Sequence, residues 1–381
     1  STDISKVKAS GIAKPKLLIM VFLLAGALGG VAGGLFASLQ SYITPDAFTF
    51  EMSVLFFIAI LIGGRGSILG PVLGTIILTA LPEFAAPLVQ WSTFLYAVLL
   101  LAIVLLVPGG IADLLDFKNR RPLTQHREIV PRKELLSRVL DRPSGRHTIA
   151  LKDIALHFGG VRAIDGLDLE IHSGEVHGLI GPNGSGKTTT LNVISGYYKP
   201  NTGTLKLDGA DMPFDQPHAR ANYRIARTFQ TPRLVGAASV LENVMIGGTV
   251  HGQATFTEAM LSLPRNRRDE KRLREAAMQA LATVGLESLA DVRADRLQHS
   301  ELRFMEIARA LMLRPVFLLL DEPAAGLSTE EIRRLGDLIK AISREGTGVL
   351  LVEHHADLIF DICDRVTVLN LGKELAAGTP A

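Results

Sequence analysis

A glycine-rich segment, Gly181-Pro-Asn-Gly-Ser-Gly-Lys-Thr188, constrains the fold of this chain more than any other feature. It matches the pattern G-x-x-x-x-G-K-[ST] at every fixed position. Residues 175–180 before it predict a short buried strand, and residues 189–195 after it predict a helix. A strand, a glycine-rich loop and a helix in this order predict a phosphate-binding unit of an α/β fold. A chance match in an ordinary turn is disfavoured because all three parts are in register.

The chemistry of such a loop predicts a bound nucleoside triphosphate. Its backbone N–H groups point inward at phosphate oxygens, and Lys187 reaches the β- and γ-phosphates. The hydroxyl of Thr188 is suited to hold Mg²⁺, and the start of the next helix adds its dipole. We therefore expect ATP and Mg²⁺ as cofactors. The expected nucleotide-binding residues here are Gly181, Pro182, Asn183, Gly184, Ser185, Gly186, Lys187, Thr188 and Thr189.

Two adjacent acids follow a second apolar run. Residues 318–320 predict a buried strand that ends in Asp321 and Glu322. The first carboxylate can hold Mg²⁺ through water, and the second can orient and deprotonate an attacking water. Two acids at an ordinary strand end are the alternative, which their position behind a phosphate loop disfavours.

Three single residues become candidates for the nucleotide site because of their order along the chain. Gln230 follows a short predicted strand and could reach both Mg²⁺ and the lytic water. His354 ends the strand after the carboxylates, where an imidazole can contact the γ-phosphate. Phe158 lies at a strand end 29 residues before Lys187, where its ring could stack on a nucleobase. A structural role is the alternative for His354, and core packing is the alternative for Phe158.

The N-terminal part of the chain has the composition of membrane-spanning segments. Residues 17–109 contain four charged residues, and residues 17–39 form an uncharged run of 23, long enough to cross a bilayer. Glycines at every fourth position of this run predict close packing against other helices. Two of the apolar segments are short and flanked by glycine and proline, so they can be spanning helices or a re-entrant pair. We place apolar segments at about 17–39, 53–63, 68–81 and 93–107.

Charge outside these segments predicts the orientation of the chain. Lysines precede the first segment, and lysine and arginines follow the last, so both ends are expected in the cytoplasm. This requires an even number of crossings and predicts a multi-pass protein of the inner (cytoplasmic) membrane. The net charge of +2 gives no support for a nucleic-acid partner. The single cysteine, Cys363, excludes an intrachain disulfide and fits a reducing compartment.

A basic stretch and a change of pattern follow the apolar segments. Residues 118–147 carry nine Lys/Arg against three Asp/Glu, and three prolines limit regular structure. Attraction to anionic lipid headgroups and a solvated tether are both open for this linker.

From Thr148 the pattern is α/β: residues 149–157 and 166–172 predict antiparallel strands. Residues 316–320 and 348–352 predict buried parallel strands, and residues 255–315 are helical in pattern.

Taken together, these motifs resemble the ATPase subunit of an ABC transporter, over Thr148 to Ala381. The segments 226–234, 306–311 and 323–327 are similar to those of branched-chain amino-acid importers in particular. The resemblance implies a role for each motif residue. Lys187 and Thr188 belong to the phosphate loop, Gln230 is the Q-loop glutamine, Asp321 the Mg²⁺-associated acid, Glu322 the general base and His354 the switch histidine.

The apolar part resembles the same transport system. Residues 41–48 and 62–74 are similar to the C-terminal half of a permease subunit of those importers. The chain is thus expected to join part of a permease to its ATPase and to be a piece of something longer. The expected fold class is multi-domain, with α-helical transmembrane segments followed by an α/β P-loop ABC ATPase domain with a helical subdomain. The expected parts are a permease part at 1–117, a basic linker at 118–147, and an ATPase domain at 148–381 with its helical subdomain at about 235–315.

One segment departs from the family pattern. The family signature is Leu-Ser-Gly-Gly-Gln or a close variant, and it opens a helix whose N-terminus contacts the γ-phosphate held by the opposing ATPase. Residues 297–301 here are Leu-Gln-His-Ser-Glu, so the serine hydroxyl, the close-approach glycine and the final glutamine are all replaced. Glu301 brings a negative charge near an anion site. His355, where these importers usually have an aspartate, is a milder departure.

The resemblance implies a component of an ATP-driven importer for branched-chain or related amino acids. An importer of urea or short amides is one alternative, and an ATPase-impaired subunit is another because of residues 297–301. A soluble ABC ATPase of repair or translation is disfavoured by the membrane segments. The expected partners are a second ABC ATPase subunit in a heterodimer, a second permease subunit, an extracytoplasmic solute-binding protein and the lipid bilayer, without nucleic acid.

Overall fold

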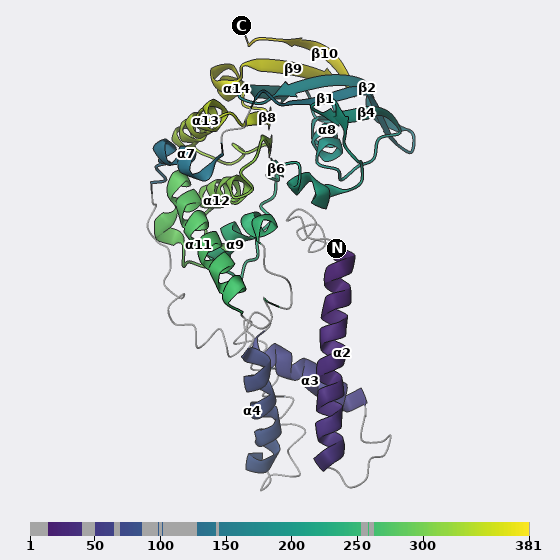
Figure 1. The fold of residues 1–381 in the computed structure, drawn as a ribbon, viewed down its shortest axis with the longest axis vertical. Coiled ribbons are helices and arrows are strands. Elements are labelled where there is room, and N and C mark those ends of the chain that lie inside the picture. Colours follow the sequence, from purple (N-terminus) through teal and green to yellow (C-terminus); the bar gives the residue numbers. More distant parts are fainter. Residues whose placement is uncertain are drawn as a thin grey trace. The chain divides into compact units, whose positions relative to one another are not determined.

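The computed structural model describes most of the chain and divides it into two compact units (Figure 1). The smaller unit is Leu18–Thr124, and the larger unit comprises Ser1–Leu17 and Gln125–Ala381. The predicted segment 93–107 lies outside the described residues except for residues 98 and 101. The described residues are 14–39, 50–64, 69–85, 98, 101, 128–141, 145–252, 258 and 263–380.

Helix α2, Lys14–Leu39, contains the predicted apolar run 17–39. Within the described residues, its part Leu18–Leu39 is the one helix long and apolar enough to cross a membrane. Its 22 residues extend about 33 Å, against a hydrocarbon core of about 30 Å. The glycines of this helix, including Gly30, were expected to pack closely against other helices. A Cβ placed on any of them would have no described neighbouring atom within 4 Å. Any partner of these glycines lies outside the described residues.

Helices α3, Phe50–Gly63, and α4, Gly70–Ala85, form a tightly packed pair. A Cβ on Gly74 would overlap the carbonyl oxygen of Ala59, so the two backbones meet closely there. Their 14 and 16 residues extend only about 21 and 24 Å, less than the hydrocarbon core. The spanning and the re-entrant alternatives for this pair therefore both stay predictions.

The larger unit contains an antiparallel sheet with the strand order β2-β1-β4-β5. Its strands have one face on the core, because buried residues alternate along β1 and β2. The predicted strands 149–157 and 166–172 lie inside β1 and β2, and β2 starts earlier than predicted. The bounds are β1 Thr148–Phe158, β2 Val161–His172, β4 Thr202–Leu207 and β5 Ala210–Asp211.

A second sheet has six strands in the order β10-β9-β3-β8-β7-β6. All neighbours pair in parallel except β10, which is antiparallel to β9 at the edge. Every residue of β7 and β8 is buried, which is typical of parallel strands covered on both faces. The bounds are β3 Val176–Ile180, β6 Ile225–Arg227, β7 Phe317–Asp321, β8 Gly348–Val352, β9 Arg365–Asn370 and β10 Lys373–Gly378.

The helix after the glycine-rich loop, α8, Lys187–Ile194, joins the two sheets into one core. It starts two residues before the predicted helix, at Lys187. Leu191 and Val193 on α8 are fully buried in the same cluster as Ile164 of β2 and Leu319 of β7. The glycine-rich loop is therefore anchored at both ends by buried apolar residues.

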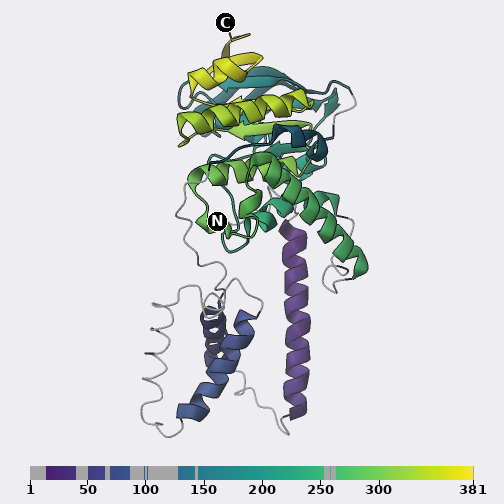
Figure 2. The same ribbon diagram turned by 90° about the vertical axis from the view of Figure 1, so that its left-hand side faces the viewer.

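The remaining helices cover the six-stranded sheet or form a separate helical group. Helices α13, Thr329–Arg344, and α14, Ala356–Ile362, pack against each other beside the sheet (Figure 2). Helices α9, α11 and α12 pack together; α11 and α12 lie within the predicted helical segment 255–315, whereas α9 comes before it. These are α9 Val240–Met245, α11 Pro264–Val284 and α12 His299–Leu311, with 3-10 helices η5 Pro217–Ala221, η6 Ile246–His251, η7 Glu287–Leu289 and η8 Ala294–Arg296.

Part of the predicted linker, residues 128–141, packs onto the larger unit. It contains η4, Lys133–Leu135, and α7, Leu136–Val139, both of which contact α11. Ile129 and Leu136 are buried, and the Arg334 guanidinium of α13 donates a hydrogen bond to the Ile129 carbonyl. This part of the linker is therefore held by protein contacts, which neither alternative for the linker foresaw.

His177 on β3 is a buried titratable residue directly before the glycine-rich loop. It is 2% exposed, and its Nε2 lies 2.9 Å from the hydroxyl of Thr367. The pKa of His177 is lowered from 6.5 to about 4, mainly by burial and in smaller part by the charges of Arg365 and His172. The imidazole is therefore neutral near pH 7 in the folded chain.

We expect His177 to make the stability of the larger unit depend on pH. Its folded pKa lies below its unfolded value, so the unfolded state takes up the proton first as pH falls. Stability is complete above about pH 6.5 and is lost as pH falls toward about 4, by about 3 kcal/mol. The measurement is the opening free energy from hydrogen exchange of peptides covering β3 in the full chain.

The variant His177→Gln keeps a donor near Thr367 but cannot titrate, so its stability should lose this pH dependence. His218→Gln on η5 is the matched control and should retain it. An unchanged pH slope in His177→Gln would contradict the assignment.

Candidate nucleotide site

The predicted site residues lie just after the ends of four neighbouring strands of the six-stranded sheet, all at the same edge. Gly181 follows β3, Glu322 follows β7, His354 comes shortly after β8, and Gln230 comes shortly after β6. These strands are parallel, so their carboxyl ends lie on the same side of the sheet. In open α/β sheets, ligands bind outside this edge.

The glycine-rich loop between β3 and α8 has a backbone that favours glycine. Gly181, Gly184 and Gly186 have φ of +149°, +80° and +103°. A Cβ on Gly186 would lie 2.6 Å from the Ala163 carbonyl oxygen, so a side chain there is also excluded by space. The loop leads directly into the start of α8, where free N–H groups and the helix dipole favour binding of an anion.

The Lys187 side chain turns back into the glycine-rich loop. Its ammonium donates hydrogen bonds to the carbonyls of Gly181, at 2.7 Å, and Pro182, at 3.0 Å. Burial lowers the pKa of Lys187, while the charges of Glu322 and Asp321 oppose that shift. The two acids that we assigned to the site are thus close enough to act on the lysine.

Glu322 lies between two of the predicted catalytic residues. The Gln230 amide donates a hydrogen bond of 2.7 Å to Glu322 Oε2, and His354 Nε2 lies 3.0 Å from Glu322 Oε1. Glu322 itself has φ +49°, a conformation that is costly for a residue with a side chain and is common at functional sites. The structure therefore brings the three predicted catalytic residues, Glu322, Gln230 and His354, into direct contact.

Asp321 has a partner that the sequence analysis missed. The Arg227 guanidinium, at the end of β6, forms an ion pair of 2.9 Å with Asp321 Oδ2, and both side chains are buried. Arg227 also donates to Asn192, at 2.7 Å, and to Ser195, at 3.0 Å, at the end of α8. The only signal in the sequence was a charged residue at the end of a predicted strand three residues before Gln230.

The residues present fit a hydrated divalent cation beside the loop. Asp321 Oδ1 and Ser185 Oγ are buried and have no hydrogen-bond partner among the described residues. Buried polar oxygens are normally satisfied, so these two are suited to contact a cation or water. Thr188, whose hydroxyl was predicted to hold Mg²⁺, is exposed at the start of α8, and Thr189 is partly exposed.

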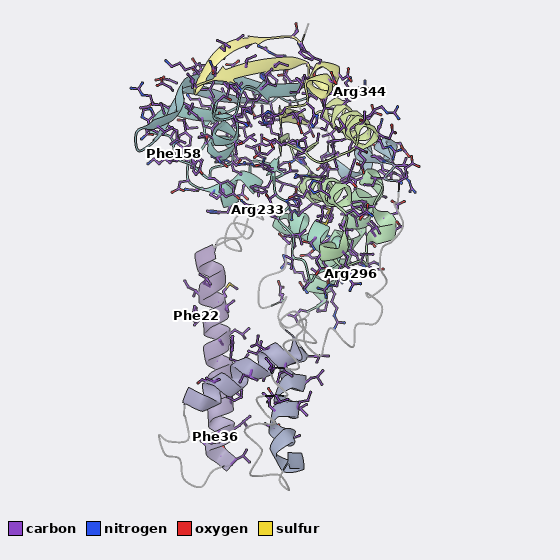
Figure 3. The ribbon with its side chains drawn as sticks, turned by 180° about the vertical axis from the view of Figure 1, so that it is seen from behind. Phe22, Phe36, Phe158, Arg233, Arg296 and Arg344 are labelled. Atoms are coloured by element: carbon purple, nitrogen blue, oxygen red, sulfur yellow. The ribbon has the colours of Figure 1, made fainter. Side chains whose placement is uncertain are left out.

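Phe158, at the end of β1, is not a core residue. It is 47% exposed, and its ring packs edge-to-face on Tyr198, with centroids 5.2 Å apart (Figure 3). An exposed ring is free to stack on a flat ligand. Core packing, the alternative that we considered for Phe158, does not apply.

The altered signature segment forms the start of α12. Glu301 is 3% exposed, and its carboxylate accepts a 2.8 Å hydrogen bond from the Gln298 backbone N–H. His299 Nε2 lies 2.9 Å from the Ala325 carbonyl oxygen, in the loop that follows Glu322. The Glu301 charge therefore caps its own helix, where the dipole favours it, and is not directed freely outward.

Comparison with known proteins matches both parts of the chain. Residues 164–325 match the family model of the ABC transporter, and residues 2–108 match that of the permease component of the branched-chain amino acid transport system. The branched-chain amino acid transport ATP-binding protein BraF of Pseudomonas aeruginosa is 37% identical over 236 residues, covering 62% of this chain and 92% of BraF. The chain belongs to the ABC transporter family.

Other members of the family agree with this assignment. LivG of Escherichia coli K12, also a branched-chain amino acid transport ATP-binding protein, is 35% identical, covering 61% of this chain and 91% of LivG. A solved nucleotide-free ATP-binding cassette from an ABC transporter is 30% identical, with a TM-score of 0.54, covering 61% of this chain and 91% of the cassette.

These matches confirm several expectations from the sequence. The chain joins part of a permease to an ABC ATPase, and its ATP-binding cassette is the ATPase component of an ABC transporter. The predicted fold class, helical segments followed by an α/β ABC ATPase, is confirmed. The permease match and helix α2 indicate that the chain associates with a membrane.

We expect Glu322→Gln to retain ATP while losing hydrolysis. The substitution keeps the hydrogen-bonding shape between Gln230 and His354 but removes the base, which should lower the rate at least a hundredfold. The measurement is phosphate release by the assembled complex, with the base of the partner ATPase also removed. ATP binding is measured in the same samples.

Glu330→Gln is the matched control, because Glu330 is an exposed acid on α13 that pairs with Arg333 and Arg334 of its own helix. It should keep the parental rate. A Glu322→Gln complex that hydrolyses ATP at the parental rate would rule out the proposed base.

Proposed function

We propose that this chain is a component of an importer for branched-chain or related amino acids. The observation that carries this proposal is the joining of a branched-chain permease match to a cassette of the same transport system. Both BraF and LivG are named for branched-chain amino acid transport, and the permease model is named for that system. ATP binding and hydrolysis at the cassette then drive the passage of solute through the permease.

The contacts around the loop support a division of roles in hydrolysis. Lys187 binds the β- and γ-phosphates, aided by the backbone N–H groups from Gly181 to Thr189. Glu322 orients and deprotonates the attacking water. His354 and Gln230 hold the Glu322 carboxylate from both sides, at 3.0 and 2.7 Å. Phe158 stacks on the nucleobase from its exposed position.

We assign Mg²⁺ to the oxygens of Thr188, Gln230 and Asp321. The unpartnered Asp321 Oδ1 supports this assignment, because a carboxylate oxygen is the ligand that Mg²⁺ prefers. Bound Mg²⁺ supplies neutralisation of the charge on the transferring phosphoryl group. Arg227 holds the other oxygen of Asp321 and so orients the carboxylate toward the loop.

The placement of the chain follows from the same proposal. We assign it to the inner membrane as a multi-pass protein with a cytoplasmic ATPase domain. The proposed parts are 1–117, 118–147 and 148–381, with the helical subdomain at about 235–315. The proposed partners are a second permease subunit, a second ABC ATPase, an extracytoplasmic solute-binding protein and the lipid bilayer, without nucleic acid.

An uptake experiment tests the solute class. The complete complex in sealed vesicles is supplied with ATP and labelled leucine, isoleucine, valine, other amino acids, urea and acetamide. We expect ATP-dependent uptake of the branched-chain amino acids, and none with Lys187→Ala, which loses charge-assisted contacts to phosphate. Uptake of urea or acetamide alone would favour the alternative importer, and uptake that Lys187→Ala leaves unchanged would remove the phosphate-loop assignment.

The altered signature supports a second candidate, a subunit that hydrolyses ATP at only one of two sites. Each site of an ABC dimer combines the phosphate loop of one subunit with the signature of the other. This chain brings Glu322 and His354 to one site and residues 297–301 to the other. A heterodimer with a partner that carries an ordinary signature would preserve one hydrolytic site, with this chain's phosphate loop in it.

We expect the triple variant Gln298→Ser, Ser300→Gly and Glu301→Gln to raise the ATPase rate. Restoring donors that face the γ-phosphate recovers transition-state stabilisation, of about a hundredfold for a single donor. The measurement is the ATPase rate of the chain alone and of the heteromeric complex. Because Glu301 also caps α12, Glu301→Gln alone is the control for the loss of the cap. No gain in either setting would show that the signature does not limit the second site.

A further inference from the structure

Residues 323–327 connect Glu322 to the start of helix α13, and we call them the connecting loop. The first half of this loop is held by the segment that follows β8. The Ala324 N–H donates a hydrogen bond of 2.6 Å to the carboxylate of Glu353, which is 2% exposed. The other oxygen of Glu353 accepts a 3.0 Å hydrogen bond from the His354 N–H. The start of the connecting loop is therefore fixed relative to His354.

The second half of the connecting loop is held by the altered signature segment. His299 is the first residue of α12, and its Nε2 lies 2.9 Å from the Ala325 carbonyl oxygen. A carbonyl oxygen can only accept, so the imidazole carries a proton on Nε2 and donates it. A Cβ built on Gly326 would lie 2.9 Å from the same nitrogen, so the ring also contacts the loop backbone. Among the described residues, His299 is the one side chain that hydrogen-bonds to residues 325–327.

Helix α12 also holds the segment that carries Gln230. Arg303 lies one turn after His299 on the same face of α12, and its side chain is buried. Its Nη1 donates a 3.0 Å hydrogen bond to the carbonyl of Phe229, the residue directly before Gln230. Gln230 in turn donates to Glu322 at 2.7 Å. One helix therefore contacts the two segments that meet in the hydrogen bond between Gln230 and Glu322.

The backbone at Glu322 makes these contacts important for its carboxylate. Its φ of +49° is costly for a residue with a side chain, and such a conformation persists only where the surrounding structure enforces it. Release of residues 325–327 would allow the backbone to relax toward an ordinary conformation. The carboxylate would then move relative to Gln230 and His354, and small displacements of a catalytic group lower the rate of the reaction strongly.

We propose that His299 is a positioning residue for ATP hydrolysis at this chain's own nucleotide site. Its Nε2–H holds the connecting loop so that Glu322 stays between Gln230 and His354. A residue of the signature segment thus acts on the site that contains the phosphate loop of the same chain, whereas the family signature contacts the γ-phosphate held by the opposing ATPase. The inference rests on the proposed role of Glu322 as the base and names a residue that positions this base.

A matched pair of variants separates the hydrogen bond of His299 from the space that its side chain fills. His299→Gln places an amide N–H near the position of Nε2, whereas His299→Met has a side chain of the same length without a donor. Glutamine and methionine have similar helix propensities, so α12 should form equally well in both variants. The proposal predicts that the glutamine variant behaves like the parent and that the methionine variant does not.

The first measurement is phosphate release by the assembled complex with the base of the partner ATPase removed, which reports on the site of Glu322. We expect His299→Met to lower kcat about fivefold, because a single hydrogen bond contributes a modest factor. The KM for ATP should stay within about twofold of the parental value, since the phosphate loop is unchanged. His299→Gln should keep both kcat and KM.

The reverse arrangement is the control for an ordinary signature role. Glu322→Gln is placed in this chain and the base of the partner is left intact, so hydrolysis takes place at the site to which this chain brings residues 297–301. His299→Met should leave the rate in this arrangement unchanged. A loss that occurs only in this arrangement would assign His299 to contacts with the nucleotide of the other site.

The second measurement is amide hydrogen exchange of the full chain in lipid nanodiscs. In His299→Met, peptides covering residues 325–327 should exchange about fivefold faster than in the parent, while peptides of β8 keep the parental rate. In His299→Gln, both sets should keep it. This result does not depend on whether Glu322 is the base, so it separates a failure of this inference from a failure of the proposed role of Glu322.

Four results would overturn the proposal. These are a parental kcat in His299→Met, an equal loss of kcat in His299→Gln and His299→Met, and parental exchange of residues 325–327 in His299→Met. The fourth is a loss of hydrolysis that is confined to the reverse arrangement.

Discussion

The parallel pairing of β3, β8, β7 and β6 is the constraint on which the larger unit depends. Because parallel strands end on one edge, segments far apart in the sequence leave the sheet side by side. Glu322 shows the consequence, since Gln230 and His354 reach its carboxylate from two other strands. The left-handed backbone at Glu322 is a strain that the paired strands on either side of β7 can sustain.

Buried charge links this edge of the sheet to the helical group. Arg227 ties Asp321 to the end of α8, while Arg309 of α12 pairs with Glu306 and donates to the carbonyl of Arg233. Removing one member of such a network leaves another buried charge without a partner, which is strongly destabilising. The first pair therefore orients Asp321, and the second holds α12 against the segment that follows β6.

Joining a permease part and an ATPase in one chain changes how the two meet. A covalent connection makes their encounter intramolecular, with an effective concentration set by the length of the connection. The docked segment 128–141 shortens that connection, because it contacts both α11 and α13. It also bridges the helical group and the sheet-bearing part of the ATPase.

The sequence by itself determined the elements and the chemistry of the loop. The apolar runs predicted β3, β7, β8, α2 and the α3–α4 pair, because burial and helix length leave a direct mark on local composition. It also predicted Lys187, Asp321 and Glu322 as site residues, because Lys187 belongs to one local loop motif and the two acids end one apolar run. Only the tertiary structure decided that Arg227 would pair with Asp321, that Glu301 would cap α12, and that residues 128–141 would pack on the larger unit. These outcomes depend on which side chains meet across distant segments, and no local pattern carries that information.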